Sequence, residues 1–300
     1  AYLMHNNGDG VFTDVTKEVA PGFLNLNMIT DSQTGDIDGD GDDDIVIASD
    51  WDNIKVFINE AGIFTEQTEK LNLSYTKGWW HTISLLDIDK DGDLDIVAGN
   101  HGLNSFFRDS TRLYVNDFDG NGTYDYIFCD KINGKYFPVA DKNDLIGQLP
   151  ILKKKLLYYK DYASMTIEDI FDAAVLESSL VLEADMKASM VFVNEGEKFE
   201  ARELPGMLQY GPVYALGAAD LDQDDFDELV VGGNQFLVKP QFGRYDALPL
   251  CVLDGAESNQ KVYSSNVISQ VRDILIETYN DKQLIIVANN DSKVEVYEKK

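Results

Sequence analysis

Oxygen-bearing side chains recur at every second position in four short segments of this chain. The first segment reads Asp36-Ile-Asp38-Gly-Asp40-Gly41-Asp42-Asp-Asp44. It has oxygen ligands at positions one, three and five, a tight turn at position six and a carboxylate at position nine. Such spacing wraps about seven oxygen atoms around one hard cation, and Ca²⁺ accepts six to eight oxygens whereas Mg²⁺ demands a near-ideal octahedron. The pattern therefore predicts about four structural Ca²⁺ ions.

The predicted ligands are the residues at positions one, three, five, seven and nine of each loop, with position seven contributing its main-chain carbonyl. They are Asp36, Asp38, Asp40, Asp42 and Asp44; Asp87, Asp89, Asp91, Asp93 and Asp95; Asp117, Asp119, Asn121, Thr123 and Asp125; and Asp220, Asp222, Asp224, Phe226 and Glu228. The fourth loop departs from the pattern at position six, where Asp225 replaces glycine, and at position nine, which is Glu228. We expect this to affect its affinity but not its fold. Each loop is filled by its own ligands, so the metals are predicted to be structural and not catalytic.

An EF-hand is the nearest alternative, but its loop needs a bidentate Glu at position twelve and a helix on each side. Position twelve here is Ile47, Ala98, Phe128 or Val231, none of which binds a cation. The residues after each loop form short β-branched or aromatic runs that indicate strands. The loops are therefore expected to join two strands.

Length and composition indicate a soluble globular chain. The 300 residues are 44% hydrophobic, and no stretch approaches the ~18 to 20 apolar residues of a membrane span. Residues 1–5 lack the basic and apolar parts of a secretory signal, so any signal was removed or lies upstream. The two cysteines, Cys129 and Cys251, lie in apolar runs and are interpreted as buried thiols, although pairing stays open.

The chain is strongly acidic, with a formal net charge of −28. Four bound Ca²⁺ ions would reduce this charge to −20. The remaining negative charge argues against nucleic acid or an anionic membrane as a partner, because both would be repelled.

Internal repetition predicts an all-β fold. The loops begin at residues 36, 87, 117 and 220, and an eroded fifth copy without the alternating acids covers 274–297. Outer hairpins carry a second signature, at 6–12, 59–64 and 194–199, and Gly99-Asn100, Gly233-Asn234 and Asn289-Asn290 suggest turns with positive φ. Two inner and two outer strands make a unit of about 50 residues, as in a propeller blade. We expect one β-propeller domain, or part of one, over 1–300, with about five recognisable four-stranded blades.

Residues 141–180 interrupt this repetition. Leu145, Leu149, Leu152 and Leu156 recur at helical spacing, and Thr166 is a candidate N-cap for a further helix. We interpret this segment as a helical insertion within the third blade that lies outside the propeller core. Strands at 112–116, 124–129 and 189–193 would complete that blade.

Motifs around the loops resemble a known family. Gly78-Trp79-Trp80 precedes the second loop, Gly99-Asn100-His101-Gly102 follows it, and a Tyr159-Lys-Asp-Tyr162 segment and Gly243-Arg244-Tyr245-Asp246 come later. This order resembles FG-GAP or VCBS repeats, as in integrin α-subunit propellers, the large extracellular VCBS proteins of Bacteroidetes-like bacteria and the cartilage acidic protein group. The resemblance covers nearly the whole chain. It implies a calcium-stapled propeller at the cell surface or secreted, and no particular activity.

Three other groups of residues each have a functional and a structural interpretation. Trp79, Trp80, His81 and His101 could form a sugar-stacking or acid–base face, but tryptophans here more often pack between blades. Arg244 and Asp246 could bind an anion or form an internal salt bridge. Lys153 to Lys155 with Tyr158 and Tyr159 form a solvated helix face or a docking surface. No nucleophile elbow, phosphate loop or zinc spacing occurs.

We therefore expect an extracellular, non-catalytic calcium-binding propeller that binds protein or carbohydrate partners at the cell surface, without inserting into the membrane. The alternative is a polysaccharide lyase or hydrolase with its site at Trp79–His81. The first hairpin lacks preceding inner strands. Either it completes the last blade or, as we expect, further blades precede Ala1.

Overall fold

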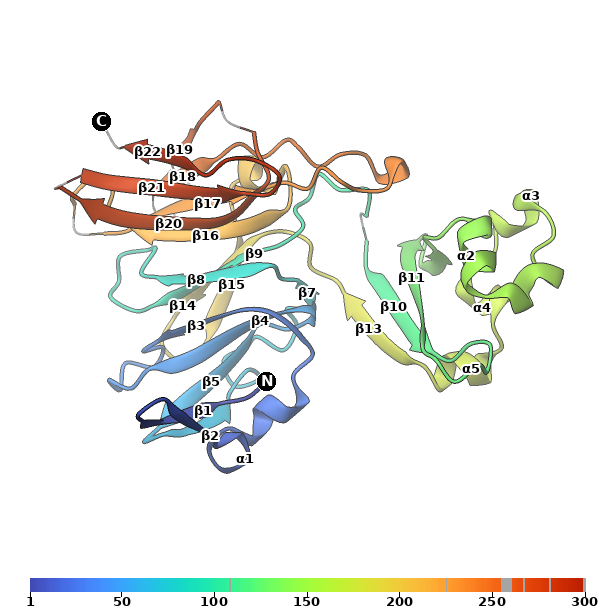
Figure 1. The fold of residues 1–300 in the computed structure, drawn as a ribbon, viewed down its shortest axis with the longest axis horizontal. Coiled ribbons are helices and arrows are strands. Elements are labelled where there is room, and N and C mark those ends of the chain that lie inside the picture. The colour runs from blue at the N-terminus through green and yellow to red at the C-terminus, as the bar shows by residue number, and fades with distance from the viewer. Residues whose placement is uncertain (108, 225, 255–260, 267, 281, 299–300) are drawn as a thin grey trace. The chain divides into compact units, whose positions relative to one another are not determined.

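The computed structural model describes residues 1–107, 109–224, 226–254, 261–266, 268–280 and 282–298. These residues are mostly β and form several small antiparallel sheets, as expected for an all-β chain (Figure 1). The chain divides into two compact units. The larger unit contains residues 1–106 and 187–300, and the inserted unit contains residues 107–186. In the described part of the chain, no helix is long and apolar enough to span a membrane.

Four sheets make up most of the larger unit. The first contains β3 (Met28–Gly35), β4 (Asp44–Asp52), β5 (Lys55–Glu60) and β6 (Ile63–Glu66), with β7 (Gly78–Trp79) also pairing β4; the second contains β8 (Thr82–Leu86), β9 (Asp95–Gly99), β14 (Met190–Asn194) and β15 (Phe199–Glu203). The third contains β16 (Val213–Ala219), β17 (Glu228–Gly233), β18 (Cys251–Asp254) and β19 (Lys261–Ser264), and the fourth contains β20 (Val271–Tyr279), β21 (Lys282–Asn289) and β22 (Glu295–Glu298).

The first strands of these sheets follow one another in space. β3 contacts β8, β8 contacts β16, and β16 contacts β20, so the sheets succeed each other in chain order (Figure 1). The sequence of strand β17 is almost continuously apolar because the strand is buried on both faces. Leu229 and Val231 pack toward the second sheet, whereas Val230 packs toward the fourth. A strand that is buried on both faces cannot alternate with polar residues.

One predicted strand pairing is wrong. The strand at 189–193 was expected to complete the blade that contains the third loop. Instead β14 pairs with β9 of the second sheet, with Phe192 opposite Ile96. Everything between β9 and β14 is therefore an excursion from the second sheet, and it includes the third loop as well as the helices.

The inserted unit has a sheet and a core of its own. Its sheet has the order β12 (Lys135–Pro138), β11 (Asp125–Ile132), β10 (Thr111–Asn116) and β13 (Leu180–Ala184); its helical segments are α2 (Lys142–Gln148), η2 (Pro150–Lys154), α3 (Tyr159–Tyr162), α4 (Ile167–Ile170) and α5 (Ala173–Glu177). The predicted cap at Thr166 is confirmed, since its side chain and Asp169 form a capping box. The helices are not peripheral to this unit. Leu145 and Leu149 are buried in one cluster with Ile127 and Cys129 of β11.

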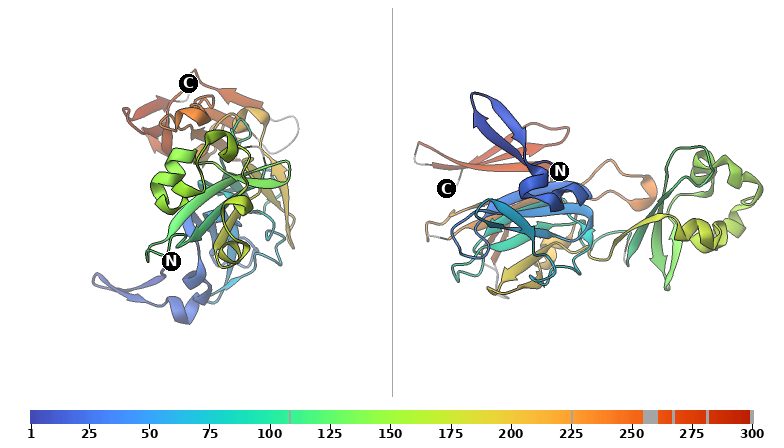
Figure 2. Two further views of the ribbon diagram at one scale, coloured as in Figure 1. Left: turned by 90° about the vertical axis from the view of Figure 1, so that its right-hand side faces the viewer. Right: turned by 90° about the horizontal axis from the view of Figure 1, so that it is seen from below.

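Both ends of the chain belong to the larger unit. The hairpin of β1 (Met4–Gly8) and β2 (Val11–Asp14) is exposed along its length and projects away from its neighbours (Figure 2). In the described residues β1 pairs only with β2, and β22 pairs only with β21. The N-terminal hairpin thus does not complete the fourth sheet. Short helices α1 (Thr16–Val19) and η1 (Pro21–Asn25) follow it. Phe23 of η1 packs edge-on against Phe57 of β5, with the two ring centroids 4.8 Å apart.

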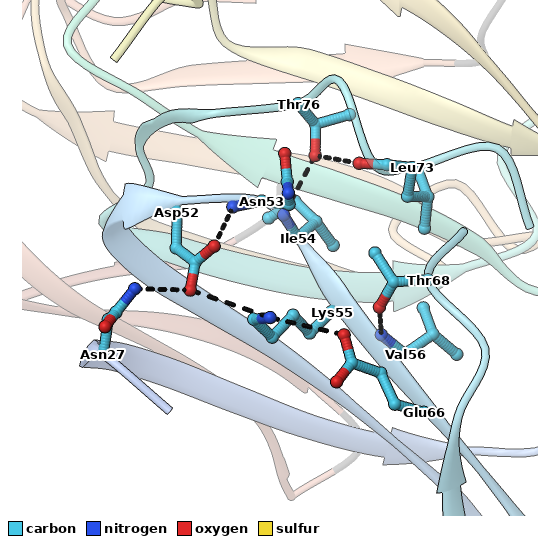
Figure 3. A network of polar contacts seen from close by, with 10 residues as sticks. All are labelled: Asn27, Asp52, Asn53, Ile54, Lys55, Val56, Glu66, Thr68, Leu73 and Thr76. Carbon is cyan, nitrogen blue, oxygen red and sulfur yellow. Dashed lines mark hydrogen bonds and ion pairs between the residues drawn. The ribbon is translucent and has the colours of Figure 1, made fainter. Parts of the chain in front are cut away.

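A polar network fixes the connection between β6 and β7 onto the first sheet (Figure 3). The carboxylate of Asp52 accepts a hydrogen bond from the Asn27 amide at 2.8 Å and lies 3.8 Å from the Lys55 ammonium. The backbone N–H of Ile54 donates to the Thr76 hydroxyl at 3.0 Å. The bond to Thr76 holds the irregular segment between β6 and β7, which leads to Trp79 and the second sheet.

The turns after the inner hairpins have different causes. Among the residues predicted there, only Asn234 has positive φ, at 79°. Gly99 is required by close packing instead. A Cβ atom at that position would lie 2.7 Å from a methyl carbon of Val213. Two short helical segments, η3 (Gly206–Gln209) and η4 (Pro240–Phe242), lie in the later connections.

Candidate metal centres

All four aspartate-rich loops join two antiparallel strands, as predicted. They lie between β3 and β4, β8 and β9, β10 and β11, and β16 and β17. Position six has positive φ in the first three loops, at Gly41, Gly92 and Gly122. Position six of the fourth loop, Asp225, lies outside the described residues. Three loops are thus in the larger unit and one is in the inserted unit.

A second constrained position was missed in the sequence. Position four has positive φ in every loop, at Gly39 (76°), Lys90 (69°), Gly120 (73°) and Gln223 (66°). Two of these residues are not glycine, so the requirement was hidden. In the first three loops, the two left-handed residues at positions four and six turn the chain back on itself. As a result the N–H of position six donates to the position-one carboxylate, at 3.0 Å between Gly41 and Asp36.

Each loop brings three carboxylates together. Ligand oxygens lie within 4.8 Å of one another in the sets Asp36, Asp38 and Asp40; Asp87, Asp89 and Asp95; Asp117, Asp119 and Asp125; and Asp220, Asp222 and Glu228. The first set contains positions one, three and five. The others contain positions one, three and nine. The remaining predicted ligands lie in the same loops but outside these sets. They are the carboxylates of Asp44, Asp91 and Asp224 and the position-seven residues Asp42, Asp93, Thr123 and Phe226. Asn121, at position five of the third loop, accepts a hydrogen bond from the backbone N–H of Thr123.

The carboxylate at position nine is buried in every loop. Asp44 and Asp95 are fully buried, and Asp125 and Glu228 are 8% and 5% exposed. In each loop the backbone N–H of position two donates to this carboxylate, for example from Ile88 to Asp95 at 2.9 Å. The position-two side chain is itself buried and apolar in all four loops. This residue anchors the loop in the core and aims its N–H at the acid.

Burial changes the acidity of these groups. It raises the pKa of Asp44 and of Glu228 above their usual values. For Asp95, burial together with the nearby charges of Asp89 and Asp91 raises the pKa to about 6. Asp95 is nevertheless ionised at neutral pH. Three carboxylates that converge without a cation repel one another, so the arrangement is unfavourable by itself.

The donor set fits a hard divalent cation. It consists of oxygen atoms only, with no histidine or thiolate nearby in any set. In the second loop, the Oδ1 atom of Asp89 is buried and has no hydrogen-bond partner in the described structure. A buried carboxylate oxygen without a donor needs a compensating ligand. Bound Ca²⁺ would provide it and would neutralise the cluster.

Two asparagines support the loops in a role that was not predicted from the sequence. Asn59 and Asn194 begin the outer hairpins of the first and second sheets. Their backbone N–H groups donate to the position-nine carboxylates, Asn59 to Asp44 at 2.8 Å and Asn194 to Asp95 at 2.7 Å. Both side-chain amides donate to the carbonyl at position eight of the same loop, and that of Asn194 also donates to Ile37 in the first loop. The signal was the asparagine shared by both hairpin motifs.

The fourth loop differs from the others in its charge balance. Lys90, at position four of the second loop, forms a 2.9 Å ion pair with Asp224 at position five of the fourth. The same ammonium lies 4.3 Å from the ring centroid of Phe226. A predicted calcium ligand is therefore engaged by a lysine from the neighbouring sheet.

The other candidate groups have structural surroundings. Trp80 is fully buried against Phe192, and Trp79 is 8% exposed and contacts His101. The predicted salt bridge between Arg244 and Asp246 is confirmed at 3.0 Å. Cys129 and Cys251 are both buried and free.

The basic and aromatic segment of the inserted unit is mixed. Tyr158 and Tyr159 are 61% and 53% exposed, whereas the Lys155 ammonium donates to the Ile170 carbonyl at 2.9 Å. Lys155 is therefore a structural residue of this unit.

The geometry defines a class of protein: a mostly β chain of small sheets whose paired strands are joined by repeated acidic loops. Comparison with protein families agrees with this over part of the chain, since residues 36–98 match the FG-GAP-like repeat. This segment contains the first two loops and the strands between them. Comparison with curated protein sequences gives no match.

One solved structure with a weak likeness is the V. cholerae biofilm matrix protein Bap1. The identity is 14% and the TM-score is 0.21, over 91% of this chain and 53% of that chain. The chain thus spans about half the length of Bap1. A likeness at this level carries no argument about fold or function.

Proposed function

We propose that this chain is an extracellular calcium-binding module of the β-propeller type, which presents a surface to protein or carbohydrate partners. The observation that supports it most is that three carboxylates lie close together in each of the four loops. In each loop the position-nine acid is also buried, without a basic partner in the described residues. Asp44, Asp95, Asp125 and Glu228 are the acids that would need the cation. Positions one, three and five, with the position-seven carbonyl, would complete each shell.

Bound Ca²⁺ would supply charge neutralisation and a fixed turn, and no reaction step is assigned to it. The chain's own residues perform the rest. Position two anchors the loop in the core, and Asn59 and Asn194 tie two of the loops to the outer hairpins. Calcium binding is thereby coupled to the packing of strands within each sheet.

The succession of contacts from β3 to β8, β16 and β20 supports the propeller arrangement, because the innermost strands of successive blades adjoin in this way. The FG-GAP-like match over 36–98 agrees with it. Extracellular modules of this kind bind calcium with Kd values on the order of 10⁻⁴ to 10⁻³ M, so their sites are filled only where calcium is abundant. This favours a location outside the cell.

Catalysis is not part of the proposal. The enzymatic alternative needed an open tryptophan face for sugar stacking, but Trp80 is fully buried and Trp79 nearly so. The acidic clusters are themselves accounted for as calcium sites.

Calcium removal tests the proposal. The protein would be stripped with EGTA, dialysed against Ca²⁺ or Mg²⁺, and analysed for bound metal and melting temperature. We expect up to four Ca²⁺ per chain and a higher melting temperature with Ca²⁺ than with Mg²⁺, since a ligand of the native state stabilises it by mass action. Fewer than two Ca²⁺ per chain with an unchanged melting curve would overturn the proposal.

A further inference from the structure

The inner strands of the larger unit carry β-bulges at matching positions. In β3, β16 and β20, one extra residue interrupts the register just after the strand begins; these residues are Thr30, Tyr214 and Arg272. In β8 the strand begins at Thr82, and His81 occupies the matching place before it. A bulge re-aims one side chain out of the regular alternation, and bulges are enriched beside functional sites.

These four positions border one cavity. It has a volume of about 280 Å³, and residues from all four inner strands line it, among them Asp31, Gln33, His81, Tyr214, Arg272 and Asp273. The cavity lies at the beginning of the inner strands, whereas the calcium loops follow their ends. It is therefore distinct from the metal centres.

The cavity is built around a stack of three side chains. The His81 ring lies on one side of the Tyr214 ring, with centroids 4.3 Å apart and planes 16° from parallel. The guanidinium of Arg272 lies 4.2 Å from the same centroid. Arg272 is also fixed by hydrogen bonds from Nη1 to the carbonyls of Asn234 and Val271. These groups are positioned before any ligand arrives.

Two polar atoms, one in this stack and one beside it, have no hydrogen-bond partner in the described structure. The Nε2 atom of His81 is buried without a hydrogen-bond partner, and so is the Oδ1 atom of Asp50, which lies 3.9 Å from Nδ1 of the same ring. Burial is the main cause that lowers the pKa of His81, to about 3, so this ring is neutral and can accept or donate one hydrogen bond. Buried polar groups without partners are uncommon in stable folds and mark sites completed by a ligand or water.

The lining selects the chemistry of the ligand. Gln33 and Asp273 offer acceptors and an amide donor, and Arg272 and His81 offer donors. The net charge of −28 disfavours polyanions, and the cavity lining combines the carboxylates of Asp31 and Asp273 with the guanidinium of Arg272. A neutral ligand with closely spaced hydroxyl groups, each both donor and acceptor, matches this mixed lining best. The Tyr214 ring is already stacked with His81 and contacted by Arg272, so recognition depends on hydrogen bonds.

We propose that this cavity binds a single neutral sugar residue, such as the exposed end of a glycan, through its hydroxyl groups. The volume suits one residue, since ligand pockets for larger molecules begin at roughly 300 Å³. The inference rests on the proposed binding function and names its ligand class.

Saturation-transfer NMR and calorimetry on the calcium-loaded chain test it. The probes are the neutral sugars glucose, galactose, mannose, fucose and N-acetylglucosamine, with glucuronate and glucosamine as charged counterparts. We expect at least one neutral sugar to bind with Kd on the order of 1–10 mM, as for a small ligand held by a few hydrogen bonds. Its charged counterparts should bind more weakly.

Variants locate the site. Gln33→Leu should weaken binding about five- to tenfold through the loss of hydrogen bonds, and His81→Phe should weaken it similarly while keeping the stack on Tyr214. Thr34→Ala, on the opposite face of β3 from Gln33, is the matched control and should bind normally. Absence of binding by every neutral sugar in a sample that still binds calcium would overturn this inference alone. Preference for glucuronate or glucosamine, or unchanged binding by Gln33→Leu, would also overturn it.

Discussion

Replacing Asp95 by Asn should reduce the stabilisation of the protein by Ca²⁺, while it should change the stability of the calcium-free protein only slightly. Asp95 is fully buried at position nine of the second loop, and its oxygens accept N–H groups from Ile88 and Asn194. In the absence of metal this carboxylate is a buried charge with no counter-ion in the described residues. With calcium it becomes a ligand.

The free-energy cost of this buried charge in the calcium-free protein follows from the pKa of Asp95. The pKa of Asp95 rises from 3.8 to about 6, mainly because of burial. About two pKa units at 1.36 kcal/mol each mean that the charge costs roughly 3 kcal/mol at pH 7. Asn removes that cost, but its NH₂ group faces a backbone donor, and the unmade hydrogen bond costs about 1–3 kcal/mol. The calcium-free variant should therefore differ from wild type by less than ~2 kcal/mol.

The calcium-loaded comparison should differ more. If Kd is about 10⁻⁴ to 10⁻³ M, then 10 mM Ca²⁺ stabilises the native state by roughly 1.4–2.7 kcal/mol per site. Asp95→Asn should lose this share, so its stabilisation by Ca²⁺ over EGTA should shrink by that amount. Asp93→Asn is the matched control, because position seven binds through its carbonyl. Urea denaturation of both variants with Ca²⁺ or EGTA measures the difference.

The sign of the pH dependence follows from the same group. A carboxyl whose folded pKa exceeds its unfolded value stabilises the fold when protonated, and this is lost as pH rises through about 4 to 6. The calcium-free wild type should thus gain stability between pH 7 and pH 4 relative to Asp95→Asn. Equal calcium responses in wild type and Asp95→Asn, together with normal responses in Asp93→Asn, would refute the assignment of Asp95 as a ligand.

Three further outcomes are expected. Lys90→Met should strengthen Ca²⁺ binding at the fourth loop several-fold by calorimetry, because it frees Asp224, whereas Lys55→Met, with the same charge change on β5 of the first sheet, should not. Leu149→Ala should destabilise the inserted unit by about 2–5 kcal/mol through a core cavity, seen by urea denaturation, and should leave the calcium response of the larger unit unchanged. Asn194→Ala should cost about 1–3 kcal/mol, because the Leu94 and Ile37 carbonyls lose a buried donor, and an unchanged unfolding midpoint would contradict its bridging role.

The sequence predicted local structure well because the loops carry their own geometry. Alternate oxygens, a glycine at position six and an apolar run after position nine each depend on neighbours only a few residues away. The outer hairpins were also predictable, since the Asn59 and Asn194 motifs specify a turn. Even the N-cap at Thr166 follows from local chemistry.

The cavity and the supporting contacts could not be predicted in this way. His81, Tyr214 and Arg272 are far apart in the sequence and meet only through the packing of three sheets. No local sequence pattern marks a β-bulge, so the sequence could not predict that these three side chains meet. The ion pair between Lys90 and Asp224 was equally unpredictable, because these two residues are 134 positions apart in the sequence.

The wrong strand pairing has a simple origin in the spacing of the loops. The second and fourth loops begin 133 residues apart, and this interval was divided by the third loop as if that loop marked another blade. Residues 107–186 instead form a unit with its own sheet, core and acidic loop. Removing those 80 residues leaves an interval of 53, close to the 51 residues between the first and second loops. The period of about 50 residues thus belongs to the larger unit alone, and the third loop is a separate use of the same acidic-loop geometry. An insertion between β9 and β14 is tolerated there because the two strands still pair directly, with Val97 opposite Val191.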